Sequence, residues 1–256
     1  MPYVSVVIAV YRDTRFLAAT LDSIRAQSYP DWECVIVDDG SGDQVHADIS
    51  AMVAGDPRFR VLRNDKNSGL ASALNKGWRD ARGALIARID ADDTCMPERF
   101  QQQVDFLNAH PEIDVVGSSA IIFDPLNHTE KTLWMIETHD KIMQKFFKLT
   151  PLLHPTVMMR RAFLEQTGGY DERFRWGAQD FVLWATGAAN ARYHNLQQPL
   201  IRYRREGVPS WRRVAAGAAA RCVGGRRMQR TMAGVYSACR LVVYALAVKL
   251  GLRSWQ

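Results

Sequence analysis

Several features that mark particular protein classes are missing from this 256-residue sequence. Its four cysteines form no C-x-x-C pair and have no histidine at zinc-finger spacing, so we expect free thiols in a reducing compartment and no structural zinc. No basic segment followed by an apolar one opens the chain, so we expect no signal peptide and a cytoplasmic protein. The apolar run 241–248 has 8 residues, and a membrane-spanning helix needs about 20.

Acidic residues are nearly absent from the C-terminal end. From Arg204 to Gln256 there are 11 lysines and arginines and one acid, Glu206, which gives a formal charge of +10. Since the whole chain carries +6, residues 1–203 carry −4. We therefore expect a folded domain over 1–205 and a basic, partly apolar helical tail over 206–256.

Several roles are compatible with the sequence of this tail. A basic segment beside an apolar stretch suits the anionic inner face of the cytoplasmic membrane, where each nearby cation contributes roughly 1 kcal/mol. The tail would otherwise pack on the domain, form a dimer contact or present a nucleic-acid patch. We expect no nucleic-acid partner, and the pattern favours the membrane surface or packing.

Short apolar segments alternate with helical patterns through the first half of the chain. Buried strands are predicted at 4–10, 34–37, 59–62 and 84–89, with helices beginning near residue 13 and over 70–81 and 98–108. This order predicts a mostly parallel, Rossmann-like sheet with right-handed crossovers and helices on both faces. Loops rich in Asp, Asn, Ser and Gly then gather at one sheet edge, where such folds bind ligands.

After residue 112 the pattern is more mixed. Strands are expected at 115–117, 120–123 and 156–159, and helices over 139–149 and from Gln179 onward.

Three acids follow the fourth predicted strand directly, in Asp90-Ala91-Asp92-Asp93. Carboxylates this close repel one another unless a cation neutralises them, and Mg²⁺ and Mn²⁺ prefer carboxylate oxygen. Taken alone, such a cluster is also typical of a solvated loop or a helix cap. Its place at the end of a buried strand favours a metal site.

Six segments, in this order, resemble family 2 glycosyltransferases with the GT-A fold. The resemblance covers roughly residues 3–204 and rests on VSVVIAVY (4–11), VIVDDGS (35–41), NSGLASALNKG (67–77), DADD (90–93), GGYDE (168–172) and QDFVLW (179–184). It implies a GT-A domain followed by the basic tail.

The resemblance implies a site for a nucleotide-diphosphate sugar at the sheet edge. Asp39 would accept a hydrogen bond from the base, Asp90 would contact the ribose or the metal, and Tyr11 would stack on the base or merely pack. The alternative for either Asp38 or Asp39 is to cap the turn over 40–43. The complete set of donor-binding residues is Ala9, Val10, Tyr11, Asp38, Asp39, Asn67, Gly69, Asn75, Asp90, Ala91 and Asp92.

A divalent metal, Mn²⁺ or Mg²⁺, is implied at the same place. Asp92 would be its main ligand, with Asp90 and His154 as further candidates, and it would act as a Lewis acid toward the diphosphate leaving group. Asp93 would assist or cap the following turn. A lone histidine such as His154 is also typical of a packed side chain.

Asp180 is the candidate catalytic base. Family 2 enzymes invert the anomeric centre by direct displacement, so a carboxylate must take the proton from the acceptor hydroxyl. Relatives commonly have Glu-Asp where this chain has Gln179-Asp180, and an N-cap aspartate is the structural alternative. Arg175-Trp176 lacks the upstream glutamine of processive enzymes, which favours a non-processive enzyme.

The sequence therefore predicts an inverting, metal-dependent hexosyltransferase. It would move a sugar, most readily from a UDP-linked donor, to a hydroxyl of a glycan or lipid-linked acceptor in cell-surface polysaccharide assembly. The alternatives are a non-catalytic protein that binds a sugar nucleotide or a membrane, and a nucleotidyltransferase on a similar sheet.

Overall fold

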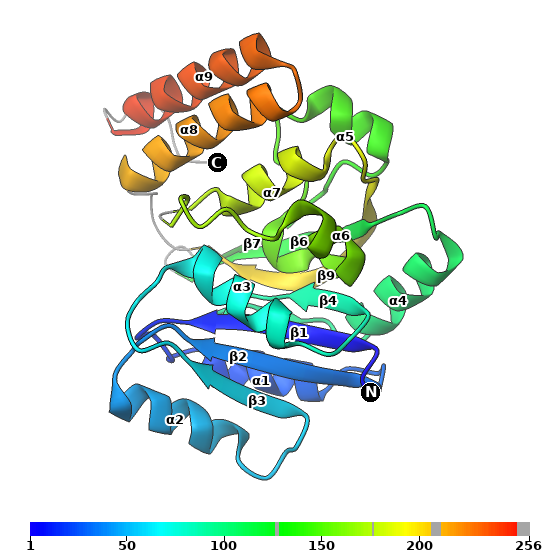
Figure 1. The fold of residues 1–256 in the computed structure, drawn as a ribbon, viewed down its shortest axis with the longest axis vertical. Helices are drawn as coiled ribbons and strands as arrows, with labels where there is room; N and C mark the ends of the chain where they lie inside the picture. Colours follow the sequence, from blue (N-terminus) through cyan, green and yellow to red (C-terminus); the bar gives the residue numbers. More distant parts are fainter. Residues whose placement is uncertain (126–127, 176, 206–210, 250–256) are drawn as a thin grey trace.

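The computed structural model describes residues 1–125, 128–175, 177–205 and 211–249 (Figure 1). Four parallel strands form its N-terminal half: β1 (Val4–Val10), β2 (Trp32–Asp38), β3 (Phe59–Arg63) and β4 (Leu85–Arg88). They lie in the order β3-β2-β1-β4, so β1 pairs with β2 on one side and β4 on the other. The predicted strands and their parallel pairing are confirmed, and all four carboxyl ends meet at one edge.

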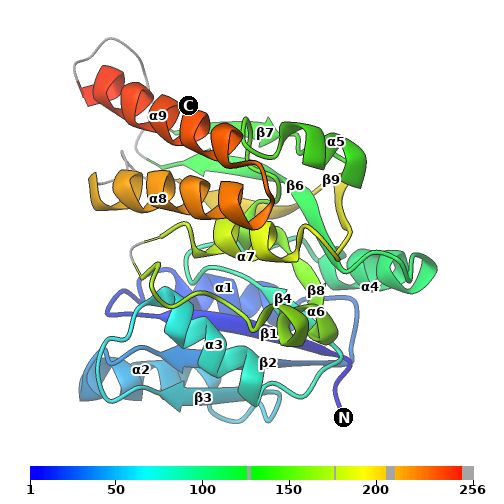
Figure 2. The same cartoon turned by 45° about the horizontal axis from the view of Figure 1, so that its top comes forward.

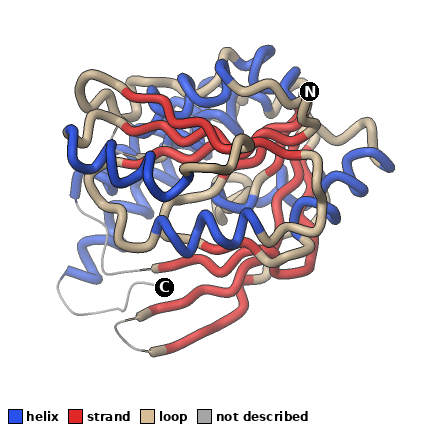
Figure 3. The backbone as a smooth tube through the Cα atoms, turned by 90° about the horizontal axis from the view of Figure 1, so that it is seen from below, coloured by secondary structure: helices blue, strands red, loops and turns tan. Residues whose placement is uncertain are grey.

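The C-terminal half extends this sheet with strands of mixed direction. β8 (Met158–Arg160) runs antiparallel to both β4 and β6 (Val115–Asp124), while β9 (Tyr193–Arg204) runs parallel to β6. The two short strands β5 (Thr94–Cys95) and β7 (Thr129–Leu133) complete it. Figure 3, in which strands are red, shows the sheet curving from the upper part of the molecule round to its lower edge.

The mixed half differs in detail from the sequence prediction. The two strands expected at 115–117 and 120–123 are one strand, β6, whose pairing with β9 is irregular around Ser118 and Ser119. The strand expected at 156–159 begins later, because His154–Thr156 forms a 3₁₀ turn. β9 was not predicted, since the polar residues Gln197 and Gln198 interrupt its apolar pattern.

Helices cover both faces of the sheet, as predicted. The helices α1 (Leu17–Arg25), α2 (Asp43–Val53) and α4 (Arg99–Ala109) bury apolar side chains on one face. The other face carries α3 (Leu70–Asp80), α5 (His139–Lys145), α6 (Arg161–Thr167) and α7 (Gln179–Gly187). A Cβ at Gly77 of α3 would lie 2.5 Å from Cγ1 of Val7, so glycine lets this helix lie close against β1.

The basic tail folds into a helical hairpin of α8 (Trp211–Arg227) and α9 (Thr231–Lys249). α8 packs on α7, where a Cβ at Gly224 would lie 2.9 Å from the Phe181 ring. Figures 1 and 2 show α7, α8 and α9 stacked in that order, with α9 outermost. Within the described residues, none of the helices combines the length and the apolarity needed to cross a bilayer. The parts of the predicted tail at 206–210 and 250–256 lie outside the described residues.

Candidate donor and catalytic site

Asp39, just after β2, joins two loops at the carboxyl edge of the sheet. Its Oδ1 accepts hydrogen bonds from Nδ2 of Asn64 at 2.8 Å and from the backbone N–H of Ser68 at 2.9 Å. Its Oδ2 accepts from Nδ2 of Asn67 at 3.0 Å and from the N–H of Gly69 at 2.8 Å. The buried carboxylate therefore shapes the loop that leads into α3. The base contact expected of Asp39 is not tested by these contacts and stays a prediction.

Asp38 and Gly40 hold the neighbouring turn. Asp38 is fully buried; its Oδ1 accepts from the N–H of Ser41 at 2.9 Å, and its Oδ2 lies 3.1 Å from Nδ1 of His46. Gly40 has a φ of 74°, and a Cβ there would lie 2.5 Å from the carbonyl carbon of Lys66. Glycine therefore permits both the left-handed turn and the close approach of the two loops. The turn-capping alternative describes the contacts of Asp38.

Asn75 lies in α3 and binds the GGYDE segment. Its Nδ2 donates to the carbonyl of Tyr170 at 2.8 Å and to Oε1 of Glu172 at 2.9 Å. Its Oδ1 accepts from the N–H of Tyr170 at 2.9 Å and from Nε1 of Trp78 at 3.0 Å. All four hydrogen-bonding positions of this buried amide are thus used within the protein, and the predicted contact of Asn75 with the donor stays a prediction.

The end of β1 contributes one exposed ring to the edge. Val10 is buried and Ala9 half-buried, whereas Tyr11 is exposed with the Arg12 guanidinium 5.0 Å from its ring centre. The carbonyl of Val10 accepts from the N–H of Asp39 at 2.8 Å, which fixes the β1 and β2 ends together. An exposed Tyr11 is available to stack on a base.

The acidic cluster lies at the end of β4, on the same edge. Carboxylate oxygens of Asp90, Asp92 and Asp93 lie within 4.8 Å of one another. Asp92 is exposed, the intervening Ala91 is half-buried, and Asp93 is fully buried. Oδ1 of Asp93 accepts from the N–H of Arg204 at 2.8 Å, so this oxygen contacts the end of β9 and does not cap the following turn.

Two observations show that this cluster fits a hard divalent cation. Although Asp92 is exposed as a whole, partial desolvation of its carboxylate and the charge of Asp90 raise its pKa; full burial and the same charge raise the pKa of Asp93 well above its ordinary value. Oδ2 of Asp93 is buried without a hydrogen-bond partner, which is costly for a carboxylate. An all-oxygen donor set is the one that Mg²⁺ and Mn²⁺ prefer, so a cation would relieve both penalties.

Arg88 lies at the end of β4 and was not predicted from sequence. This buried guanidinium makes a two-pronged ion pair with Asp90, with Nη1 2.7 Å from Oδ2 and Nη2 in contact with Oδ1. Its charge also acts to lower the pKa of Asp92, Asp93 and Asp180. An arginine inside the apolar segment 84–89 was the signal, because buried arginines require a partner.

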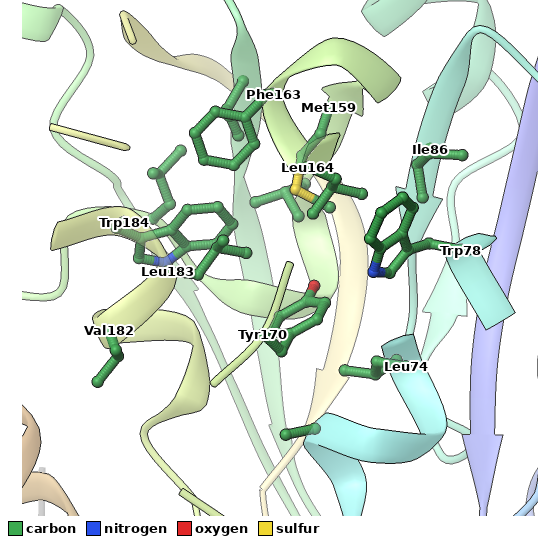
Figure 4. Packing of buried hydrophobic residues seen from close by; sticks show 14 of the residues in the cluster. Leu74, Trp78, Ile86, Met159, Phe163, Leu164, Tyr170, Val182, Leu183 and Trp184 are labelled. Carbon is green, nitrogen blue, oxygen red and sulfur yellow. The ribbon is translucent and has the colours of Figure 1, made fainter. Parts of the chain in front are cut away.

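His154 lies in the core beside the site. Its Nε2 is 2.9 Å from the Tyr170 hydroxyl, and its ring centre is 6.2 Å from that of Trp184. Burial and the charge of Arg88 hold its pKa well below the ordinary value, so the imidazole is neutral at pH 7. The described acidic cluster does not include His154, and its expected role as a metal ligand stays a prediction. Figure 4 shows Tyr170 between Trp184 of α7 and Trp78 of α3.

Asp180 is the second residue of α7, half-buried at the helix N-terminus. The helix N-cap is Ala178, so Asp180 is not the capping residue. Burial raises the pKa of Asp180, against the lowering effects of the Phe181 N–H and of the Arg88 and Arg221 charges. A carboxylate with a raised pKa suits a general base. Trp176, named above with Arg175, lies outside the described residues.

Arg221 of α8 connects the tail to this helix. Its guanidinium lies 5.1 Å from the Phe181 ring centre, and its Nε donates to Oγ of Ser237 at 3.1 Å. Arg227 of α8 pairs with Asp171 at 3.0 Å. Nothing in the local sequence indicated these contacts, because they depend on how the tail folds back.

Comparison with known proteins gives the family. The profile of glycosyl transferase family 2 matches residues 5–168. A Bacillus subtilis protein named as a glycosyltransferase, EpsE, is 33% identical over 208 residues, which are 80% of this chain and 74% of that protein. The Escherichia coli UDP-Gal:alpha-D-GlcNAc-diphosphoundecaprenol beta-1,3-galactosyltransferase is 26% identical over 206 residues, 78% of this chain and 73% of that enzyme.

Solved structures show the same fold. Staphylococcus aureus TarS 1–349 in complex with UDP-GlcNAc superposes with a TM-score of 0.74 at 19% identity, covering 96% of this chain and 72% of that one. The mannosyltransferase PcManGT of Pyrobaculum calidifontis, in complex with GDP-Man and Mn²⁺, gives 0.68 at 22% identity over 99% and 76%. The fold is therefore GT-A, as predicted. Because the family profile matches residues 5–168 and EpsE is 33% identical, the chain belongs to glycosyl transferase family 2.

Proposed function

We propose that this protein is an inverting, metal-dependent, non-processive hexosyltransferase that uses a UDP-linked sugar. The observation that carries the proposal is the acidic cluster with an unsatisfied buried oxygen, at the same sheet edge as the Asp39 loop. The Escherichia coli relative is named for a UDP-linked donor, and two structural neighbours hold nucleotide sugars, one with Mn²⁺.

The chain's own residues divide the donor between two groups. Asp39 and the loop that it fixes, with the exposed Tyr11, form the side that would receive the nucleoside. Asp92 and Asp93 would hold the cation, with Asp90 oriented by Arg88 beside them. When bound, the metal supplies Lewis-acid stabilisation of the charge that grows on the departing diphosphate.

Asp180 would accept the proton of the attacking acceptor hydroxyl. Its half-buried carboxylate and raised pKa favour proton uptake over a fully solvated aspartate, and the N-terminus of α7 holds it in place. The charge of Arg88 acts to lower the pKa of Asp180, and its guanidinium pairs with Asp90 of the acidic cluster. One buried cation therefore offsets negative charge at both the base and the metal ligands.

We propose a glycan or lipid-linked acceptor at the inner face of the cytoplasmic membrane, within cell-surface polysaccharide assembly. The names of two relatives support this: the Escherichia coli enzyme acts on a diphosphoundecaprenol-linked sugar, and AmsE of Erwinia amylovora is named for amylovoran biosynthesis. The basic tail supports placement at a membrane surface.

Calorimetric titration of UDP, GDP, CDP and dTDP, with and without Mn²⁺, tests the proposal. We expect UDP to bind in a Mn²⁺-dependent way, and Asp92→Ala to lose that dependence while staying folded. Tight binding of another nucleotide would replace UDP in the proposal. No binding of any nucleotide to folded protein would contradict it.

A further inference from the structure

α9 packs against α8 with its small side chains. Gly234, Ser237, Ala238 and Ala245 are buried, and a Cβ at Gly234 would lie 2.9 Å from Cα of Gly225. The two backbones therefore approach closely. A helix that only covers a protein core usually does the opposite and turns its large apolar side chains inward.

Leu241 of α9 packs toward Gly217 of α8, whereas a second set of large apolar side chains on α9 points away from the protein. At 100° per residue they fall within an arc of about 100° and run for roughly 21 Å along the helix. We call these residues the outer stripe: Met232, Val235, Tyr236, Val243 and Leu246, which are 80%, 41%, 66%, 65% and 45% exposed. Figures 1 and 2 place α9 on the outside of the molecule, so among the described residues no element covers the stripe.

We propose that the outer stripe lies on the surface of a membrane that contains anionic lipid. Arg226, Arg230 and Arg240 are exposed on the same hairpin, and the Arg240 guanidinium is 5.9 Å from the Tyr236 ring centre. The sequence has no acid after Glu206. Apolar side chains beside arginines and a tyrosine are the pattern of a helix that lies in a lipid interface.

Charge favours an anionic lipid surface over a second copy of this chain as the partner of the outer stripe. Pairing two outer stripes would bring together two C-terminal segments, 204–256, that each carry +10, and neither segment has an acid after Glu206 to offset the repulsion. An anionic lipid surface supplies the opposite charge over the whole hairpin. This inference rests on the proposed function, because a lipid-linked acceptor lies at such a surface.

The test is flotation of the full chain with phosphatidylcholine vesicles, with and without phosphatidylglycerol. We expect the wild type to float with the anionic vesicles, and Met232→Ser, Val243→Ser and Leu246→Ser combined to bind more than about tenfold more weakly. The matched control is Trp134→Ser with Leu149→Ser, which removes side chains that are 65% and 52% exposed elsewhere. This control should bind like the wild type.

A gain-of-binding variant covers the case in which the triple variant fails to fold. Val243→Trp should strengthen vesicle binding, because it enlarges the exposed apolar face. The proposal is overturned if the wild type does not float with anionic vesicles, if triple variant and control bind equally, or if the stripe variants change only the oligomeric state. Nucleotide calorimetry without vesicles is independent of these outcomes, so failure of the membrane contact and failure of the proposed function are distinguishable.

Discussion

The carboxylates at the ends of β2 and β4 lie on the same sheet edge but differ in how fully the protein satisfies their hydrogen-bonding capacity. Asp39 accepts four hydrogen bonds from the loop before α3. In the acidic cluster, Asp93 has a buried oxygen without a partner, and its pKa and that of Asp92 are raised. Asp39 therefore builds the wall of the site, whereas the acidic cluster keeps binding capacity for a ligand.

Asp180 is a third carboxylate, with the proposed role of catalytic base. Replacing it by asparagine keeps the shape but removes the proton acceptor, so we expect turnover to fall by about 10²–10⁴-fold. Nucleotide affinity should stay within a few-fold of the wild type, because Asp180 is not one of the donor-binding residues. Steady-state kinetics and calorimetry on the same preparation check both values. Normal turnover by Asp180→Asn would remove Asp180 from the mechanism.

Because Asp39 accepts four hydrogen bonds from the loop before α3, we expect its replacement to destabilise the protein. Asp39→Asn turns one acceptor into a donor that faces the N–H groups of the loop, so we expect the free energy of unfolding to fall by about 3 kcal/mol. Asp92→Asn is the matched control and should change it by less than about 0.5 kcal/mol, since Asp92 is exposed and its charge is repelled by Asp90. Urea denaturation without metal measures both. If both variants lost the same free energy of unfolding, Asp39 would have no greater structural role than Asp92.

The raised pKa of Asp180 predicts the pH range in which activity is lost on acidification. The base acts as a carboxylate, and burial raises its pKa, so the active form is lost at a higher pH than for a solvated aspartate. Below that pKa, kcat/KM should fall about tenfold per pH unit. A pH profile in which this limb lies in the ordinary range of an aspartate would contradict the role of burial.

Mn²⁺ should stabilise the protein through the acidic cluster. At a free Mn²⁺ concentration ten times Kd, the linkage relation gives about 1.4 kcal/mol for the wild type. Asp92→Asn should show little of this gain, while Asp39→Asn should keep most of it despite its lower stability. Thermal unfolding with and without Mn²⁺ compares them. If Asp92→Asn gained as much as the wild type, the cation would bind elsewhere.

Much of this edge follows from local sequence. Strands such as 4–10 and 84–89 are apolar apart from one residue each, and their polar loops come directly after them, so the parallel sheet and the place of Asp90 and Asp92 were predictable. β9 was not, because Gln197 and Gln198 break its apolar pattern.

Contacts between segments far apart in the chain could not be predicted from the sequence. Asp39 binds residues about 30 positions later, and Arg221 reaches the α7 helix only because the tail folds back. Arg88 is the exception, since a charge within a buried strand signals a partner that Asp90 provides.

Crystals grown with UDP and Mn²⁺ would show directly whether the acidic cluster holds the cation. Anomalous diffraction at the manganese edge should give a peak within coordination distance of the Asp92 carboxylate, beside the free oxygen of Asp93 and in contact with the diphosphate. A bound UDP whose diphosphate lies away from this cluster, or a manganese peak at another place, would contradict the account.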